Sequence, residues 1–108
     1  MSAYETLRLL ADSTRLRILR LLTVEELSVA ELQEILDMGQ SRISTHLSLL
    51  RQRGIVADRK DGKKTFYGFL NPDPPHDKLF VAALEAFSSE PDAEKDEIAL
   101  RRIVDKRR

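Results

Sequence analysis

The alternation of apolar and polar residues divides the chain into six helical stretches and one β-hairpin. Apolar side chains recur at spacings of three and four, the period that places them on one face of an α-helix. This period predicts helices at residues 2–10, 14–22, 29–36, 39–53, 77–87 and 93–106. Two shorter stretches, 55–59 and 65–70, are instead rich in β-branched and aromatic residues and flank Asp61-Gly62, a dipeptide typical of a tight hairpin turn. The pattern predicts a mainly α fold with one β-hairpin.

The fourth predicted helix has an unusual polar face. Its apolar stripe consists of Ile43, Leu47 and Leu50, and the opposite face is built from Gln, Ser, Arg, Thr and His side chains. No carboxylate occurs between residues 40 and 57. A solvated helix face usually mixes acids with bases, so an acid-free face of short hydrogen-bonding groups favours contact with a polyanion. Taken alone, the stretch is also compatible with an amphipathic core helix that has a serine-rich outer face.

The third helix and the turn after it complete a helix-turn-helix pattern. Ser28 and Glu31 have the spacing of a capping box at the start of the third helix. Residues 37–40 are expected to form a tight turn with Gly39 at its corner, and Gly54 is expected to end the fourth helix in the left-handed conformation. This arrangement predicts that the fourth helix reads DNA, because a helix about 10–12 Å across fits a major groove about 12 Å wide.

The hairpin that follows this helix has a cationic tip. Its basic side chains are Arg59, Lys60, Lys63 and Lys64. Directly after a DNA-reading helix, such a hairpin is typical of a wing that contacts the DNA backbone or the minor groove. The alternative is a solvated hairpin whose lysines discourage edge-to-edge pairing with another sheet.

The charge of the chain is unevenly distributed, although the formal net charge is zero. Residues 1–39 carry a net charge of −3 and residues 71–108 a net charge of −2. Residues 40–70 hold seven basic and two acidic side chains, a net charge of +5. Because local potential rather than total charge attracts phosphates, the central third of the chain is the expected nucleic-acid contact.

The composition excludes several other classes of function. The 108 residues suffice for one compact domain, and the absence of cysteine excludes disulfides, thiolate metal sites and thiol redox switches. No apolar run approaches the roughly 20 residues of a membrane span, and Arg8 and Asp12 interrupt any secretory signal, so we expect a cytoplasmic protein without a membrane partner. The two histidines and the scattered carboxylates show no nucleophile–base spacing, so we expect neither an enzyme nor a bound cofactor.

Three segments of the sequence resemble one known family. They are LADSTRLRILRLL at residues 10–22, SRISTHLSLLRQRGIV at residues 41–56 and RKDGKKTFY at residues 59–67. Together they are similar to the ArsR family of bacterial winged-helix repressors, and the similarity extends over about residues 3–88. The resemblance implies a winged helix-turn-helix protein that dimerises through its terminal helices. It also implies a homodimer that binds palindromic operators in double-stranded DNA and is commonly released by a metal ion or another inducer.

The residue pattern and the resemblance together name the expected contact residues. Arg42 is the expected reader of guanine, because a guanidinium can bond to both acceptors on the major-groove edge of that base. The expected DNA contacts are Gln40, Ser41, Arg42, Ser44, Thr45, His46, Arg59, Lys60, Lys63 and Lys64. The expected dimer contacts are Tyr4, Leu7, Leu10, Leu79, Phe80, Ala83, Leu84 and Phe87.

The sequence departs from the family at its metal site. Arsenic and cadmium sensors of the family carry a Cys-x-Cys within a Leu-Cys-Val-Cys-Asp-Leu run, whereas residues 27–32 here read Leu-Ser-Val-Ala-Glu-Leu. His76 beside Asp77 could be half of a site shared by two subunits, but a lone histidine next to prolines is more often a surface or capping residue. We therefore expect no metal site, and the sequence does not identify an inducer.

The C-terminal segment leaves the family pattern as well. We expect a DNA-binding and dimerisation domain at residues 1–88 and a helical extension or linker at residues 89–108. The segment DEIALRRIVDKRR, residues 96–108, is similar to the linker helix of family members fused to a methyltransferase that uses S-adenosylmethionine. Two alternatives to a repressor thus stay open: the N-terminal DNA-binding domain of such a methyltransferase, and a winged helix that binds proteins only.

Overall fold

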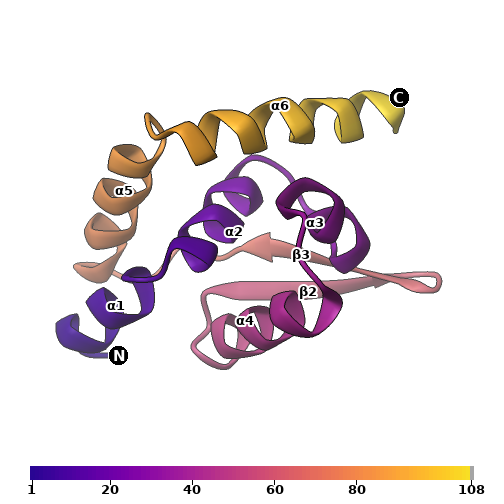
Figure 1. Cartoon of the computed structure of the whole chain (residues 1–108). Helices are drawn as coiled ribbons and strands as arrows, with labels where there is room; N and C mark the ends of the chain where they lie inside the picture. Colours follow the sequence, from indigo (N-terminus) through magenta and orange to yellow (C-terminus); the bar gives the residue numbers. More distant parts are fainter. Residues whose placement is uncertain (108) are drawn as a thin grey trace.

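The chain folds into helices packed around a small antiparallel sheet (Figure 1). The structure is a computed structural model that describes residues 1–107. Its helices are α1 (Ala3–Leu10), α2 (Ser13–Val24), α3 (Val29–Leu36), α4 (Gln40–Gln52), α5 (His76–Phe87) and α6 (Pro91–Lys106). Its strands are β1 (Leu27–Ser28), β2 (Val56–Asp61) and β3 (Lys64–Phe69). Within residues 1–107, no helix is long and apolar enough to cross a membrane.

The predicted helices and the hairpin are confirmed, and the sheet contains one strand that the pattern did not show. β2 and β3 form the hairpin, and β1 pairs with the other edge of β3, with Leu27 opposite Tyr67 and Ser28 opposite Phe66. A strand of two residues is too short to show an alternation of its own. The resulting mainly α fold with a three-stranded antiparallel sheet is that of a winged helix-turn-helix.

The start of α3 has the predicted capping box. The Glu31 N–H donates to Ser28 Oγ (3.2 Å), and the Ser28 N–H donates to Glu31 Oε1 (2.9 Å). These two bonds satisfy backbone donors that have no partner within the helix, so they help to fix where α3 begins.

The turn between α3 and α4 differs from the prediction in its left-handed residue. Asp37, with φ at 53°, takes this conformation, whereas Gly39 has φ at −71° and lies in extended backbone as the N-cap of α4. The prediction of Gly39 as the corner was therefore wrong, because aspartate also tolerates the left-handed region. Gly54 takes a φ of 72° after α4, as predicted.

The core is centred on α2. Ile18, Leu19 and Leu21 of this helix have no exposed surface, and side chains from α4 and α5 join them, including Ile43 and Phe80. Burial of this kind contributes about 1.5–3 kcal/mol for each large aliphatic side chain, which holds α4 and its outer face in one orientation.

The C-terminal helix α6 packs on this same core. It lies across α2 and α3 (Figure 1), and it buries Leu100 and Ile103 in the same hydrophobic cluster. Asp96 of α6 is 1% exposed and accepts from Arg17 Nε (2.9 Å) and Nη2 (2.8 Å) of α2. Residues 91–107 thus share the core of residues 1–88 in this structure.

Candidate nucleic-acid interface

The outer face of α4 is open, as the sequence pattern indicated. Ile43, Leu47 and Leu50 point into the core and are at most 1% exposed. The predicted DNA contacts of this helix lie outside the core. Gln40, Ser41, Arg42 and Thr45 are exposed, and Ser44 and His46 are half-buried. The amphipathic period thus places all six off the buried apolar stripe of α4.

The hairpin extends alongside this helix. It runs back along α4, and its tip projects beyond the N-terminal end of that helix (Figure 1). Gly62 makes the tight turn with φ at 63°, next to the terminal pair of Asp61 and Lys64. Lys60, Lys63 and Lys64 are exposed and form no ion pair with any residue in 1–107.

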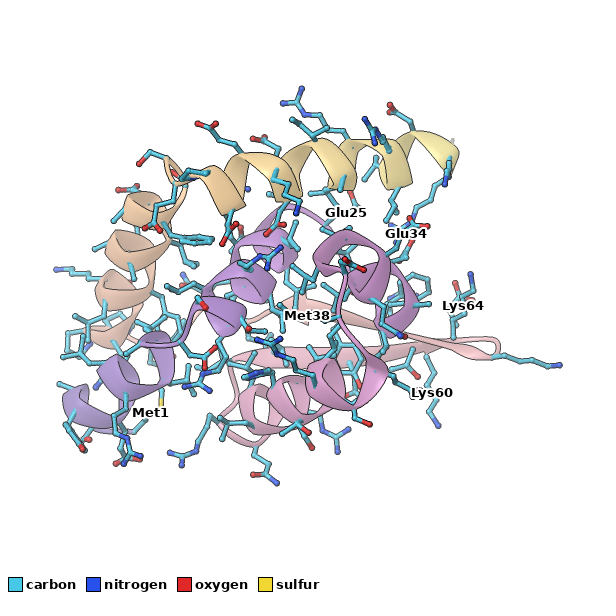
Figure 2. The ribbon with its side chains drawn as sticks, viewed as in Figure 1. Met1, Glu25, Glu34, Met38, Lys60 and Lys64 are labelled. Atoms are coloured by element: carbon cyan, nitrogen blue, oxygen red, sulfur yellow. The ribbon has the colours of Figure 1, made fainter. Side chains whose placement is uncertain are left out.

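The lysines of the tip do not share one face of the hairpin. Strand residues two apart lie on the same face, so Lys60 shares a face with buried Val56 and with Asp58. Asp58 pairs with Arg51 of α4 (3.2 Å), which identifies this as the α4 face. Lys64 lies directly across the hairpin from Asp61. Asp61 is next to Lys60 in the strand and points to the opposite face, so Lys64 lies on that opposite face as well. Figure 2 shows the two lysines on opposite sides of the hairpin, with Lys60 on the side of α4.

Three of the arginines in the basic segment are already paired. Arg51 pairs with Asp58 (3.2 Å), Arg53 with Glu5 of α1 (2.8 Å) and Arg59 with Glu26 (3.2 Å). Within residues 1–107, the basic side chains of 40–70 without an ion pair are Arg42, Lys60, Lys63 and Lys64. The local net charge of +5 therefore overstates the number of cations that a polyanion can reach unopposed.

Arg59 is held by more than one group. Besides Glu26 it approaches Asp61 (3.8 Å), and its guanidinium carbon lies 5.2 Å from the centre of the Phe66 ring. Arg107, the C-cap of α6, lies 5.4 Å from the same ring centre. The sequence pattern predicted Arg59 as a DNA contact but did not show that Glu26 and Arg107 lie beside it. These two residues are distant from Arg59 in the chain, and no periodicity relates them.

Two side chains on the outer face of α4 form internal hydrogen bonds. Arg42 Nη2 donates to Thr14 Oγ1 of α2 (3.0 Å), and Thr45 Oγ1 donates to the Ser41 carbonyl one turn earlier (2.8 Å). Arg42 keeps further N–H donors, whereas the hydroxyl of Thr45 is left as an acceptor. The first bond also ties α4 to the start of α2.

The imidazole of His46 favours its neutral form. Burial lowers the pKa of His46, and the cations Arg15 and Arg42 lower it further, while Asp12 acts in the opposite direction. A neutral imidazole both donates and accepts a hydrogen bond, so at neutral pH His46 offers this face hydrogen bonding rather than charge.

The predicted dimer contacts fall into two groups. Tyr4 and Leu7 on α1 are 67% and 54% exposed, and Leu79 and Ala83 on α5 are half-buried. The other four lie in the core of the single chain: Leu10, Phe80, Leu84 and Phe87. These four cannot offer their side chains to a second chain, because α1 and α5 turn their most apolar stripes toward α2.

Within residues 1–107, no three His, Asp or Glu side chains come together in a group that could hold a metal ion. The chain also has no cysteine, so the donors that a soft metal prefers are missing.

Comparison with known proteins shows a family match over part of this chain. The family model described as "Bacterial regulatory protein, arsR family" matches residues 12–58, from the cap of α2 into β2. The arsenical resistance operon repressor of Escherichia coli is 48% identical over 69 residues, which cover 63% of this chain and 58% of that protein. The transcriptional activator HlyU of Vibrio cholerae is 44% identical over 61 residues, 56% of either chain. The present chain spans less than two thirds of the length of these relatives.

Solved structures extend the similarity beyond the matched segment. The transcriptional repressor BigR from Xylella fastidiosa superposes with a TM-score of 0.70 at 30% identity, covering 82% of this chain and 85% of that chain. HlyU from Vibrio cholerae superposes with a TM-score of 0.66 at 30% identity, covering 82% of this chain and all of that chain (100%). The names of these relatives describe regulators of transcription and not enzymes. Residues 12–58 thus match the arsR family of bacterial regulatory proteins, and the chain has the winged helix-turn-helix fold.

Proposed function

We propose that this protein is a sequence-specific DNA-binding repressor that binds a palindromic operator in double-stranded DNA as a homodimer. The observation that carries the proposal is the acid-free outer face of α4 beside a wing whose lysines are unpaired within residues 1–107. Related chains named as repressors support the same function.

The N-terminal half of α4 reads the bases in this proposal. Recognition helices contact base edges mainly through their first turns, which here carry Gln40, Ser41 and Arg42. Arg42 donates to the two acceptors of a guanine, a contact that discriminates against other bases by about 1–3 kcal/mol. Its bond to Thr14 limits the rotation of the guanidinium and so lowers the entropy lost on binding.

The wing supplies affinity that is independent of sequence. Its lysines contact phosphates beside the groove that α4 occupies, and the counterions they displace make binding weaken with added salt. Because Arg59 is held by Glu26 and Phe66, the lysines rather than this arginine are the principal phosphate contacts of the wing.

A homodimer places two such units on one operator. Tyr4, Leu7, Leu79 and Ala83 form the contact surface, and the buried residues beneath them keep α1 and α5 in position. Two-fold pairing sets the two recognition helices about one helical turn of DNA apart, roughly 34 Å, which requires a palindromic operator.

The residues present do not fit a soft-metal inducer. Relatives are named for arsenical and mercury resistance. This chain has no cysteine and no His/Asp/Glu group of three within residues 1–107, so we derive no step that depends on a bound metal.

Operator binding by variants of the intact protein tests the proposal. A binding site is first selected from random duplexes, and its affinity is then measured by fluorescence anisotropy. We expect a palindromic site, and we expect Arg42→Ala with Lys63→Ala to weaken binding by at least tenfold, the equivalent of about 1.4 kcal/mol. The matched control, Lys95→Ala with Arg101→Ala, removes two exposed cations from α6 and should change affinity little. Equal affinities of the two double variants would contradict the proposal.

A further inference from the structure

Helix α6 belongs to a segment that neither proposed surface uses, because the proposed DNA and dimer contacts all precede residue 88. The helix crosses α2 and α3 and ends on the side of the molecule from which the wing extends (Figure 1). Its C-cap, Arg107, reaches the point where α3 begins and where β1 joins the wing strand β3. The last turn of α6 therefore contacts the helix-turn-helix and the wing at once.

The contacts of Arg107 engage every nitrogen of its guanidinium. Its Nε donates to Glu31 Oε2 (3.1 Å), and its Nη2 donates to Glu31 Oε1 and to the Glu26 carbonyl (3.1 Å). Its Nη1 donates to Glu25 Oε1 (3.5 Å), and its guanidinium carbon lies 5.4 Å from the centre of the Phe66 ring. A single exposed ion pair contributes little, but a fork that engages both oxygens of a carboxylate has a defined geometry and stronger hydrogen bonds.

The Glu31 carboxylate is itself part of the junction. It accepts from the Ser28 N–H (2.9 Å) as half of the capping box of α3. Burial acts to raise the pKa of Glu31, but the hydrogen bonds from Ser28 and Arg107 lower it overall, so this carboxylate is charged at neutral pH. Ser28 also pairs with Phe66 across β1 and β3. Arg107 thus binds the same few residues that connect α3 with the wing.

The wing depends on support at this junction. β1 pairs with β3 through two residues, Leu27 and Ser28, and beyond Phe66 the hairpin continues to its tip as two strands. A two-stranded hairpin by itself is marginally stable in water. Phe66 is half-buried, and the guanidinium carbons of Arg59 and Arg107 lie 5.2 and 5.4 Å from its ring centre. The contacts at Phe66 therefore set the direction in which the tip points.

We propose that α6 is a strap that latches the wing to the helix-turn-helix through Arg107 and so fixes the direction of the wing before DNA binds. The apolar stripe of α6 and the pair of Arg17 and Asp96 anchor the strap on the core, and Arg107 fastens its last turn at the junction. The side chain of Arg107 is 31% exposed, so the latch can open while α6 stays in place.

The latch has a consequence for DNA binding, and this consequence rests on the proposed function, whereas the latch itself does not. A wing that already points in one direction loses less conformational entropy when its lysines contact phosphates. Because those contacts are independent of sequence, loss of the latch should weaken binding to operator and random duplexes alike.

Amide hydrogen exchange of the full chain without DNA, followed in ¹H–¹⁵N spectra, tests the latch directly. Arg107→Met removes the charge and the donors of the side chain. We expect exchange of the hydrogen-bonded amides of residues 64–69 to accelerate by about tenfold, because bonds to charged groups are lost at the base of the wing. The core amides of Ile18 and Leu19 should keep their wild-type rates. The matched control is Lys106→Met, which removes an exposed cation without an ion pair in 1–107 and should leave residues 64–69 unchanged.

A second pair of variants tests the acidic side of the latch. Glu31→Gln keeps an acceptor for the Ser28 N–H but removes the charge that Arg107 binds, so it should accelerate exchange in residues 64–69. Glu34→Gln makes the same change at an exposed position of α3 and should not. Because Arg107 and Glu31 act through one contact, the double variant should exchange no faster than Arg107→Met alone.

Three results would overturn the latch. They are wild-type exchange of residues 64–69 in Arg107→Met, an equal acceleration in Lys106→Met, and an equal acceleration of the core amides of Ile18 and Leu19.

Operator affinity then separates the latch from the proposed function. Arg107→Met and Lys106→Met have the same net charge, and we expect the former to bind operator and random duplexes about threefold more weakly than the latter. Equal affinities together with accelerated exchange would contradict the consequence for DNA binding. Accelerated exchange in a protein that binds no DNA would contradict the proposed function and leave the latch standing.

Discussion

At the scale of single residues, the positive charge available to DNA depends on the cations without an ion-pair partner and not on the total number of cations. Arg51, Arg53 and Arg59 each have an acidic partner, whereas the lysines of the wing have none within residues 1–107. Exposed ion pairs contribute little to stability, yet each one neutralises a charge that the sequence counts as available. The alternation of faces along the strand then distinguishes Lys60 from Lys64.

This distinction predicts unequal effects of two similar substitutions. Lys60 lies on the face of the hairpin that points toward α4, so a duplex with α4 in its major groove lies closer to Lys60 than to Lys64. We expect Lys60→Ala to weaken binding to all duplexes and to reduce the slope of log affinity against log salt by about 1, the effect of losing one phosphate contact. We expect Lys64→Ala to have a smaller effect on both quantities. Anisotropy titrations at several salt concentrations check this, and a larger effect of Lys64→Ala would contradict it.

His46 predicts a pH dependence of stability. Its pKa is lowered in the folded protein, mainly by burial, from an ordinary value of 6.5. The unfolded chain therefore binds the proton more readily, so folding stability falls as the pH drops through about 6.5 and the loss is complete below the folded pKa. The carboxylates with lowered pKa, Glu5, Asp12 and Glu31, act only at lower pH because the ordinary values are 3.8 for Asp12 and 4.5 for the two glutamates.

Substitution of the histidine isolates this contribution. We expect His46→Gln to lose less stability than the wild type between pH 7.5 and pH 5.5, since glutamine does not titrate. His76→Gln makes the same exchange at the other histidine and is the matched control. Urea denaturation at the two pH values measures the difference, and parallel losses in both variants would show that His46 does not carry it.

At the scale of elements, a buried ion pair and a small apolar stripe help to hold α6. Arg17 and Asp96 are 12% and 2% exposed at their side chains, and both nitrogens of the Arg17 fork contact the carboxylate. The hydrogen bonds that Arg17 donates to Asp96 raise the pKa of Arg17, and burial opposes this effect. Removal of one partner from such a pair leaves the other charge buried without compensation.

This buried pair predicts that a single substitution of Asp96 lowers the stability of the fold strongly. Asp96→Asn keeps the shape of the side chain but removes the charge, so we expect the free energy of unfolding to fall by about 3 kcal/mol. Asp105→Asn changes an exposed aspartate on the same helix and should cost less than about 0.5 kcal/mol. Chemical denaturation of the intact protein measures both, and equal values would mean that the ion pair does not hold α6 to α2.

At the scale of the whole molecule, the arrangement separates two surfaces. The outer face of α4 and the wing form the proposed DNA surface, and the exposed side chains of α1 with one flank of α5 form the proposed dimer surface. Exposed large apolar side chains on α1 are consistent with a surface that a second chain covers.

The dimer predicts a loss of assembly on charge insertion. Leu7 is 54% exposed, so Leu7→Glu should leave the protomer folded while it places two like charges at the two-fold interface. We expect sedimentation equilibrium to show monomers of Leu7→Glu and dimers of Ile98→Glu, which alters an equally exposed residue elsewhere. Operator affinity of Leu7→Glu should fall as well, because one half-site alone binds weakly. A dimeric Leu7→Glu protein would place the interface on another face.

The sequence predicted those features that repeat along the chain or follow from local chemistry. The apolar stripe of α4, the capping box at Ser28 and the hairpin around Gly62 each depend on residues a few positions apart. The corner of the turn after α3 was misassigned to Gly39, because both Gly39 and Asp37 can occupy a left-handed position and only the packing of the two helices decides between them.

The tertiary structure decided which charges are neutralised and which apolar residues remain at the surface. Arg59 and Glu26 are 33 positions apart, and Arg17 and Asp96 are 79 positions apart. Such pairs form because distant helices and strands pack against a shared core, and no periodicity of the sequence encodes them. For the same reason the sequence identified Phe80 and Leu84 as apolar but not that the core of their own chain would enclose them. Local pattern determined the elements and the chemistry of their faces, and packing determined which of those faces remain free to bind.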